Sequence, residues 1–465
     1  MEKVKFNTKT ITIPADTLTP VGIYLRLRDA FPQSHLLECS DYSERSDAYS
    51  YICVKPVAGI EVTPKTYRKY HPTGEASTHS LDKVCIPDIV DGFIGQFSVE
   101  GHISKEILPG FFGFTQYNAI NLFDNVAIRN DESDIPLIRY DFYQVVIAQN
   151  HFNSTLTICE FLTDGQESIG LKIRSLLANR NISSFPFRKN GQETANLTDV
   201  QFMAMIEQGK KHCARGDVFQ IVLSRQFNHA FMGDEFNVYR ALRSINPSPY
   251  LFYFDYLGYK LFGSSPEAQL KIDKGMATIN PIAGTTARVG DPVADSKAVK
   301  NLLANPKENS EHCMLVDLAR NDLSRHSNHV TVETYRAVHA YSHLYHLVST
   351  VTGKTEDSKN VYKLFAATFP AGTLSGAPKH RAIQLIDNIE PIPRGYYGGA
   401  IGYIGLNGSL NHAIMIRSFL SQKGQLIYQG GAGIVIGSSA QCELEEVNSK
   451  VAALRRAIDL AESDY

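Results

Sequence analysis

LTDVQFMAMIEQGKKHCARGDVFQIVLSRQF, residues 197–227, contains both kinds of element from which we expect the fold to be built. Thr198 and Gln201 have the spacing of a capping box, which predicts that a helix begins here. Gly216 is placed to end that helix, because glycine readily adopts the left-handed conformation found after helices. Residues 218–227 are rich in β-branched side chains and predict a strand.

Strand patterns dominate the chain before this stretch, with alternating segments at 8–13, 49–54 and 143–148. After it, strand and helix patterns alternate with glycine-rich turns, as at 284–286 and 430–433. The order is too mixed for a TIM barrel, and no G-x-G-x-x-G follows a strand as it would in a Rossmann unit. We therefore expect an α+β fold of layered β-sheets flanked by helices.

The polar stretch 187–194 has little apolar content and is the best candidate for a domain boundary. It divides the chain into an N-terminal region, residues 1–186, and a second region, residues 197–465. The residues with candidate chemistry lie in the second region.

Composition excludes several classes of protein. The chain has 465 residues and a formal net charge of −2, with no block of Lys and Arg, so neither nucleic acid nor a membrane surface is an expected partner. The N-terminus lacks the apolar core of a signal peptide, and no apolar run is long enough to span a bilayer. Seven dispersed cysteines without a C-x-x-C pair indicate reduced thiols. These features together predict a cytoplasmic protein.

Two pairs of glutamates have helical spacing. Glu308 and Glu311 lie in one strongly helical stretch, and Glu443 and Glu446 lie in another, with Lys450 on the same helical stripe. Four carboxylates converging from two helices would repel each other unless they held a cation, and hard oxygen ligands favour Mg²⁺. The alternative is that each pair is a solvated helix face. The spacing alone favours a metal site only slightly.

Three further features could bind anions. Residues 430–433, GGAG, predict a turn after a strand whose N–H groups could hold a carboxylate, although an ordinary tight turn is the alternative. Residues 369–379 combine small residues, hydroxyls and a lysine before a helix, either as an anion-binding loop or as a polar connection. Arg417 lies in an apolar segment and needs a paired anion, which could be an internal carboxylate. His346 has apolar neighbours and would by default be a core histidine.

These segments resemble the chorismate-utilising enzymes, most closely the anthranilate synthase component I group, over nearly the whole chain. The matching strings are QIVLSR at 220–225, NPSPYLFY at 246–253, GSSPE at 263–267, PIAGTTARVG at 281–290, EHCMLVDLARNDLSR at 311–325, LVSTVTG at 347–353 directly after His346, GTLSGAPK at 372–379, YYGGAIGYIG at 396–405, IRSFL at 416–420, YQGGAGIV at 428–435 and ELEEVNSK at 443–450. So many motifs in one order are highly specific for this superfamily, and the resemblance implies its chorismate-binding fold.

Two positions in the resemblance indicate the reaction. Members that add water to chorismate have a lysine base where Gln220 stands, and a glutamine cannot deprotonate water. Typical aminodeoxychorismate synthases have a nucleophilic lysine where Ala283 stands. The resemblance therefore implies direct addition of ammonia at ring carbon two, which gives anthranilate and pyruvate, the first committed step of tryptophan biosynthesis. An aminodeoxychorismate synthase that has lost its lysine, or a catalytically silent chorismate- or tryptophan-binding regulator, is the alternative.

The resemblance also implies roles for the site residues. Glu311 and Glu446 would bind Mg²⁺ most directly, supported through water by Glu308 and Glu443. Glu267 would protonate the departing ring hydroxyl as general acid. The enolpyruvyl carboxylate would be bound by Tyr397, Arg417, Gly431, Ala432 and Gly433, and Lys450 would lie near the metal-bound end of the substrate. His346 and Thr373 would serve the second step, in which pyruvate leaves and the ring becomes aromatic.

Partners and regulation follow from the same resemblance. None of the seven cysteines has a flanking glycine, as an amidotransferase nucleophile would need, so we expect a separate glutamine amidotransferase subunit to supply ammonia. Tryptophan is the expected inhibitor, bound at Leu37, Glu38, Cys39, Ser40, Asn246, Pro247, Ser248, Pro249 and Tyr250. Cys39 stands where the family has serine, which predicts reduced sensitivity unless Ser40 substitutes.

Overall fold

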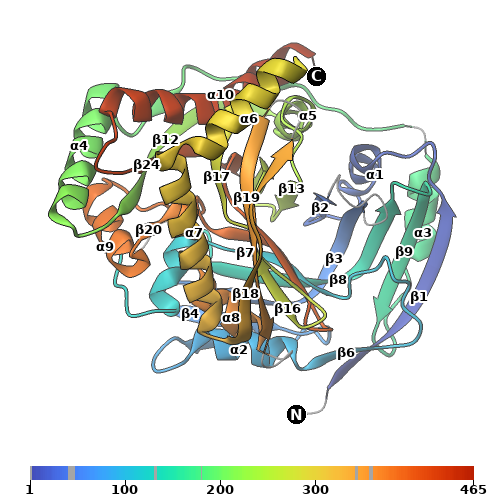
Figure 1. The fold of residues 1–465 in the computed structure, drawn as a ribbon. Coiled ribbons are helices and arrows are strands. Elements are labelled where there is room, and N and C mark those ends of the chain that lie inside the picture. The colour runs from blue at the N-terminus through green and yellow to red at the C-terminus, as the bar shows by residue number, and fades with distance from the viewer. Residues whose placement is uncertain are drawn as a thin grey trace.

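A computed structural model describes residues 3–39, 48–129, 134–179, 181–340, 344–355 and 360–464. The strands form an antiparallel network, apart from the parallel pair β1–β6, and the two long strands β3 and β8 take part in two sheets (Figure 1). The first sheet contains, in order of pairing, β6 (Phe97–Glu100), β1 (Val4–Pro14), β9 (Thr155–Leu162), β8 (Ile138–Asn150), β3 (Tyr49–Val62), β2 (His35–Cys39), β13 (Tyr250–Asp255), β14 (Tyr259–Ser265), β23 (Ser418–Gln422), β24 (Gln425–Ile434) and β12 (Gln220–Gly233), with β10 (Phe187–Lys189), β11 (Thr194–Ala195) and β20 (Gly376–Ala377) paired to β12.

The second sheet continues from the other halves of β3 and β8. It contains β5 (Ala76–Ser80), β4 (Thr66–Tyr70), β3, β8, β7 (Gly110–Thr115), β21 (Ala400–Gly405), β22 (Leu410–Ile414), β15 (Ala268–Asp273), β16 (Met276–Ile279) and β19 (Leu344–Thr355), with β17 (Ile282–Ala287) and β18 (Ser327–Ala340) paired to β19. A register shift between Pro56 and Ala58 marks the point where β3 passes from one sheet to the other.

Helices cover the outer faces of these sheets, as expected for a layered α+β fold. They are α1 (Pro20–Leu27), α2 (Ile86–Ile94), α3 (Gly170–Ala178), α4 (Asp199–Arg215), α5 (Phe236–Ile245), α6 (Pro292–Ala304), α7 (Pro306–Ser324), α8 (Val361–Thr368), α9 (Lys379–Ile389) and α10 (Ala440–Asp464), with 3₁₀ turns at Tyr117–Leu122 and Gly372–Leu374. In Figure 1, α7 runs beside β18 and β19, and α4, α9 and α10 lie around β12 and β24.

The stretch 197–227 folds as predicted. Thr198 Oγ1 accepts a hydrogen bond from the Gln201 N–H, and Gln201 Oε1 accepts one from the Thr198 N–H, so the capping box opens α4. Gly216 follows the helix with a φ of 80°. The strand then begins at Gln220, two residues later than expected.

Two strand pairs cross the predicted domain boundary. Strand β2 pairs with β13, and β7 pairs with β21, so each sheet contains strands from both regions. The large apolar core likewise draws residues from both, for example Phe111 and Ile401, which are almost completely buried. The polar stretch itself contributes β10 and β11 to the edge of β12.

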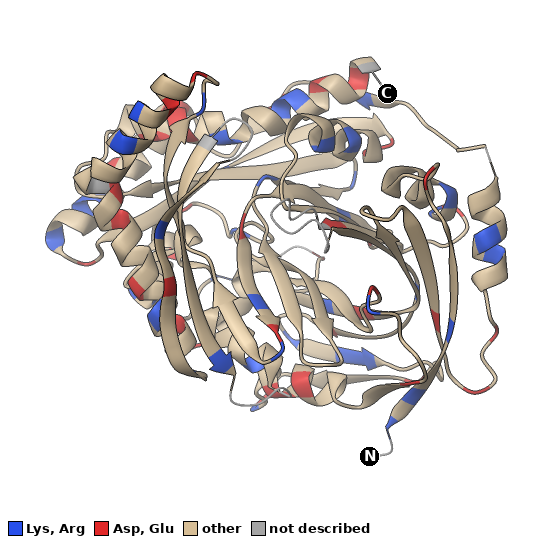
Figure 2. Ribbon diagram, turned by 45° about the vertical axis from the view of Figure 1, so that its right-hand side comes forward, with Lys and Arg blue, Asp and Glu red and all other residues tan. Residues whose placement is uncertain are grey.

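Charges are distributed over the surface of the fold. In Figure 2, basic and acidic residues alternate along the outer helices, and the strands are largely uncharged. No helix in the described ranges is long and apolar enough to cross a membrane.

Candidate active site

The glycines predicted to form a turn lie inside a strand, so that prediction is wrong. Gly431 and Gly433 belong to β24 and pair with Ser224 and Val222 of β12, because the β-branched stretch that follows α4 provides β24 with a partner. A Cβ on Gly433 would lie 2.6 Å from Gln220 Nε2, and one on Gly431 would lie 3.0 Å from Tyr397 Oη. The missing side chains therefore let Gln220 and Tyr397 approach the backbone of β24.

A cation lies beside the same strand. Lys450 of α10 donates from Nζ to the carbonyl of Gly431 at 2.9 Å and forms an ion pair with Glu446 at 2.7 Å. Burial raises the pKa of Tyr397, and Glu446 contributes to that increase. Lys450 also acts electrostatically on Glu267. The structure thus brings Gln220, Tyr397, Lys450 and Glu446 together around the end of β24.

Glu267 has the properties of an acid that is protonated near neutral pH. It immediately precedes β15, and its carbonyl accepts a hydrogen bond from the Ile414 N–H at 3.0 Å. Thr373 Oγ1 donates to Glu267 Oε1 at 3.0 Å. Burial raises the pKa of Glu267 to about 7, although the Thr373 hydrogen bond and Lys450 act in the opposite direction. A carboxyl group with such a pKa can deliver a proton to a leaving group at neutral pH.

A β-bulge positions the predicted histidine. The register of β17 against β19 shifts between Ala283 and Thr285, and Gly284 has a φ of 83° there. His346 Nδ1 lies 2.9 Å from Thr285 Oγ1. Burial lowers the pKa of His346, and Arg417 lowers it further, so the imidazole is neutral and able to accept a proton. A Cβ on Gly284 would lie 3.3 Å from Glu308 Oε2, which places the bulge beside α7.

Arg417 is a partly buried cation for which the described residues provide no carboxylate partner. Its Nη1 donates to Asn246 Oδ1 at 3.3 Å, and the described part of the chain provides it with no ion pair. Burial lowers the pKa of Arg417. Because a buried charge is costly unless it is paired, this guanidinium is suited to bind the carboxylate of a ligand.

The four glutamates predicted to bind a metal lie on two helices. Each glutamate pair keeps its helical spacing, with Glu308 and Glu311 on α7 and Glu443 and Glu446 on α10, and carboxylate oxygens are the ligands Mg²⁺ prefers. Within the described ranges, however, no three His, Cys, Asp or Glu side chains are close enough to hold a metal. Helix α7, which carries the first pair, packs against β17–β19, whereas α10, which carries the second, packs against β24 and α5. Joint binding of Mg²⁺ stays a prediction.

The predicted regulatory segments are adjacent. Strand β2 pairs with β13 so that Leu37 lies opposite Phe252 and Glu38 opposite Leu251. Residues 246–249, which comprise Asn246, Pro247, Ser248 and Pro249, connect α5 to β13. Ser40 lies outside the described residues, and the structure describes the backbone of Cys39 but not its side chain.

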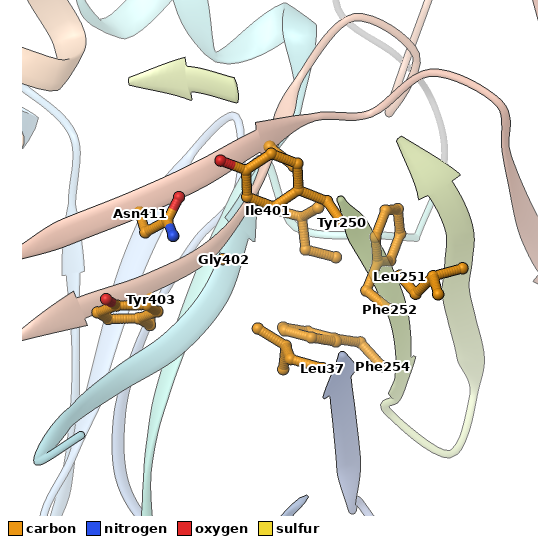
Figure 3. Close-up of a pocket in the computed structure, with 10 residues that line it drawn as sticks. Leu37, Tyr250, Leu251, Phe252, Phe254, Ile401, Gly402, Tyr403 and Asn411 are labelled. Carbon is orange, nitrogen blue, oxygen red and sulfur yellow. The ribbon is translucent and has the colours of Figure 1, made fainter. Parts of the chain in front are cut away.

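A mainly apolar cavity, partly open to solvent, lies between β13 and the β21–β22 hairpin, and its empty space of about 310 Å³ includes that open solvent. Figure 3 shows Leu37 and Tyr250 at this cavity, together with Ile401 and Tyr403 of the opposite sheet. Glu38 does not line it, because Glu38 accepts hydrogen bonds from Tyr239 at 2.6 Å and from Arg243 at 2.8 Å.

Sequence reasoning missed several buried polar residues around the site. Arg394 pairs with Glu390 and donates to the carbonyls of Leu374 and Val222, which ties the Thr373 loop to β12. In the sequence, the only indication that Arg394 belongs to the site was its position two residues before the YYGG motif.

Two further polar links join α7 to neighbouring segments. His312 Nε2 lies 2.6 Å from Ser349 Oγ, which connects α7 with β19. Lys379, considered above as a possible anion ligand, instead pairs with Asp322 at 2.6 Å. Both His312 and Asp322 lie inside matching motifs, but only the fold shows what they contact.

The site combines an acid, a neutral imidazole and an unpaired cation between two sheets, and comparisons with known proteins identify the class. Residues 38–456 match the family described as chorismate binding enzyme, and the chain belongs to this family. The particular relatives are anthranilate synthase component 1 proteins. The chain is 34% identical to that of Aquifex aeolicus, covering 96% of this chain and 93% of the relative, and 33% identical to that of Acetivibrio thermocellus, covering 97% and 95%.

Solved structures agree with this assignment. Anthranilate synthase component I from Streptococcus pneumoniae superposes with a TM-score of 0.72 at 29% identity, covering 95% of this chain and 99% of that one. The menaquinone-specific isochorismate synthase of Escherichia coli has the same TM-score of 0.72 at 18% identity, covering 98% and 96%, and so shares the fold. The expected layered α+β fold of the chorismate-binding enzymes is confirmed.

Proposed function

We propose that this protein is the chorismate-aminating component of anthranilate synthase, which converts chorismate and ammonia to anthranilate and pyruvate in an Mg²⁺-dependent reaction. The observation that carries the proposal is Glu267, a carboxyl group with a pKa of about 7 held by Thr373 in the same site as the unpaired Arg417. Chorismate requires both an acid and a cation, because it must lose a ring hydroxyl and because it is a dianion.

The first step uses the acid. Glu267 donates its proton to the ring hydroxyl, which leaves as water while ammonia adds at ring carbon two. Gln220 is 8% exposed and offers an amide, which can orient a nucleophile but cannot deprotonate water. Ala283 offers no nucleophile. Ammonia needs no base, so these two residues support amination and not hydration of the ring.

The second step uses a base. Pyruvate leaves and the ring becomes aromatic when a proton is removed from the ring. His346 is the candidate base, because its imidazole is neutral and is oriented by Thr285. Arg417, Tyr397 and the glycine strand β24 would hold the enolpyruvyl carboxylate meanwhile.

Magnesium, regulation and the ammonia source complete the proposal. Glu311 and Glu446, supported by Glu308 and Glu443, would hold Mg²⁺, which when bound neutralises the ring carboxylate. The cavity at Leu37 and Tyr250 would accept tryptophan as an inhibitor, since its apolar and aromatic lining suits an indole ring. A separate amidotransferase subunit would supply ammonia from glutamine in the cytoplasm.

A product assay tests these statements together. The purified chain is incubated with chorismate, MgCl₂ and an ammonium salt, and anthranilate is followed by fluorescence and pyruvate by a coupled assay. We expect equimolar anthranilate and pyruvate, which are lost on chelation of Mg²⁺, reduced by tryptophan and absent when glutamine replaces ammonium. A non-aromatic amino product without pyruvate would establish the aminodeoxychorismate synthase alternative. An absence of turnover would leave only a binding role.

A further inference from the structure

A second cavity lies next to Glu267 and is not lined by Arg417, His346, Tyr397 or the glycine strand. It is bounded by β15, α7 and the segment 368–373, it is partly open to solvent, and it leaves about 30 Å³ in which the centres of water molecules can lie. Its polar lining consists of Glu267, Gln269, Asp322, Thr368 and Thr373. The cavity therefore borders the general acid and the residue that holds it.

Gln269, which lines this cavity, has an unsatisfied acceptor among the described residues. Its side chain is 3% exposed, and Nε2 donates to Thr368 Oγ1 at 3.1 Å. Thr368 gives its own hydroxyl proton to the carbonyl of Phe365 at 2.9 Å, so it must accept from Gln269, and this fixes the orientation of the amide. Gln269 Oε1 then has no hydrogen-bond partner among the described residues. A buried acceptor without a donor destabilises the fold, so a donor belongs there.

The opposite wall is charged. Asp322 of α7 accepts from Lys379 Nζ at 2.6 Å, and the same Nζ donates to the carbonyl of Thr368 at 2.8 Å. Both members of this pair are largely buried, with side chains 10% exposed for Lys379 and 6% for Asp322. Cavities lined by polar groups retain water, whereas apolar cavities of similar size stay dry. The ligand chemistry that fits is a small neutral hydrogen-bond donor.

The reaction proposed above produces such a donor. We propose that the cavity is a water site that receives the ring hydroxyl released as water, holds water against Gln269 Oε1 and returns a proton to Glu267. This inference rests on the proposed function, because only loss of the hydroxyl generates water next to Glu267.

The proton balance of the step is complete. The carbon–oxygen bond of the ring hydroxyl breaks as Glu267 transfers its proton to that oxygen, and the lone pair of ammonia forms the new bond at ring carbon two. Water leaves, Glu267 is a carboxylate, and the new ammonium group loses one proton to solvent. One proton then reaches Glu267 through the cavity water, which restores the acid for the next turnover.

Two variants test the water site by separate means. Gln269→Leu removes the acceptor at similar size, and Ala319→Leu fills the cavity from α7 without removing a polar group; Ala319 lines the cavity and is 4% exposed. We expect each to lower kcat about tenfold with ammonium as the nitrogen source, with little change in KM for chorismate. The solvent deuterium isotope effect on kcat should increase, because reprotonation of Glu267 becomes limiting. Leu318→Met is the matched control on the same wall and should behave as wild type.

Crystallography provides a readout independent of activity. A high-resolution crystal structure of the wild-type chain should show water within hydrogen-bond distance of Gln269 Oε1. A dry cavity, or wild-type kcat and isotope effect in Gln269→Leu, would overturn the water site even if Ala319→Leu fails to fold. Failure of the proposed function gives a different result, since the wild-type chain itself would then form no anthranilate.

Discussion

At the scale of single residues, Glu267 and its neighbours set the proton balance of the site. Burial raises the pKa of Glu267, whereas Thr373 and Lys450 lower it, and the result of about 7 is a compromise between these effects. Burial lowers the pKa of His346, and the positive charge of Arg417 lowers it further, so the imidazole stays neutral. The site thus holds an acid and a base that are both in their active forms near neutral pH.

The pH dependence of the reaction follows from this balance. Because the acid must be protonated, kcat at a constant concentration of free ammonia should fall as the pH rises through about 7. Thr373→Val removes a hydrogen bond that stabilises the carboxylate, so the pKa of Glu267 rises. The alkaline limb should therefore move to higher pH, with Thr368→Ser as a control. A limb that moves to lower pH, or does not move, would contradict the assignment of Glu267.

At the scale of elements, α7 connects the predicted metal ligands to the catalytic sheet. His312 of α7 is completely buried and lies 2.6 Å from the hydroxyl of Ser349 in β19. That hydroxyl also accepts from the Arg336 N–H of β18 at 2.9 Å. The same helix contains Glu308 and Glu311, so this link fixes how α7 sits on the sheet that carries His346.

Breaking the link should destabilise the protein. His312→Leu removes the imidazole from the buried Ser349 hydroxyl, which keeps only its bond from the Arg336 N–H among the described residues, and this should lower the free energy of unfolding by about 2 kcal/mol. Urea unfolding followed by circular dichroism measures the change. Ser310→Ala is the control on the exposed side of α7, where the Ser310 hydroxyl bonds to the Pro306 carbonyl, and should change stability by less than about 0.5 kcal/mol. A fully stable His312→Leu variant would show that helix packing alone positions α7.

At the scale of the whole molecule, the two sequence regions share their sheets. Strand β13 pairs with β2, and β21 pairs with β7, across the predicted boundary at 187–194. The cavity at Leu37 lies between β13 and the β21–β22 hairpin and so depends on both regions. The proposed inhibitor site and the active site are thereby part of one layered structure, with Arg417 donating to Asn246 of the predicted regulatory segment.

Separating the regions should therefore prevent folding. A fragment of residues 197–465 would expose the edges of β13 and β21 and the apolar side chains packed between the sheets. We expect it to aggregate when expressed alone, as measured by sedimentation, and to become soluble when residues 1–196 are expressed with it. The full chain is the control. A soluble fragment that unfolds cooperatively would establish 197–465 as an independent domain.

The elements with strong local signals were predictable from sequence. The capping box of Thr198 and Gln201 and the cap at Gly216 form as expected, because these contacts lie within a few residues of each other. The glycine-rich segment 430–433 was misread, because a strand and a turn have similar composition there and only pairing with β12 decides between them. The helical spacing of the glutamate pairs was also correct, but spacing within a helix contains no information on how far apart two helices lie.

The sequence by itself determined the family and the residue types of the site, since the order of motifs and the local spacing of residues can be recognised without the fold. It also showed that the chain lacks the lysine base that other members have at Gln220 and the lysine nucleophile that others have at Ala283. Only the tertiary structure decided that Glu267 is an acid near neutral pH and that Gln269 Oε1 lacks a partner beside it. The reason is physical: protonation and hydrogen-bond satisfaction depend on burial and on neighbours distant in sequence, and those arise only when the sheets pack.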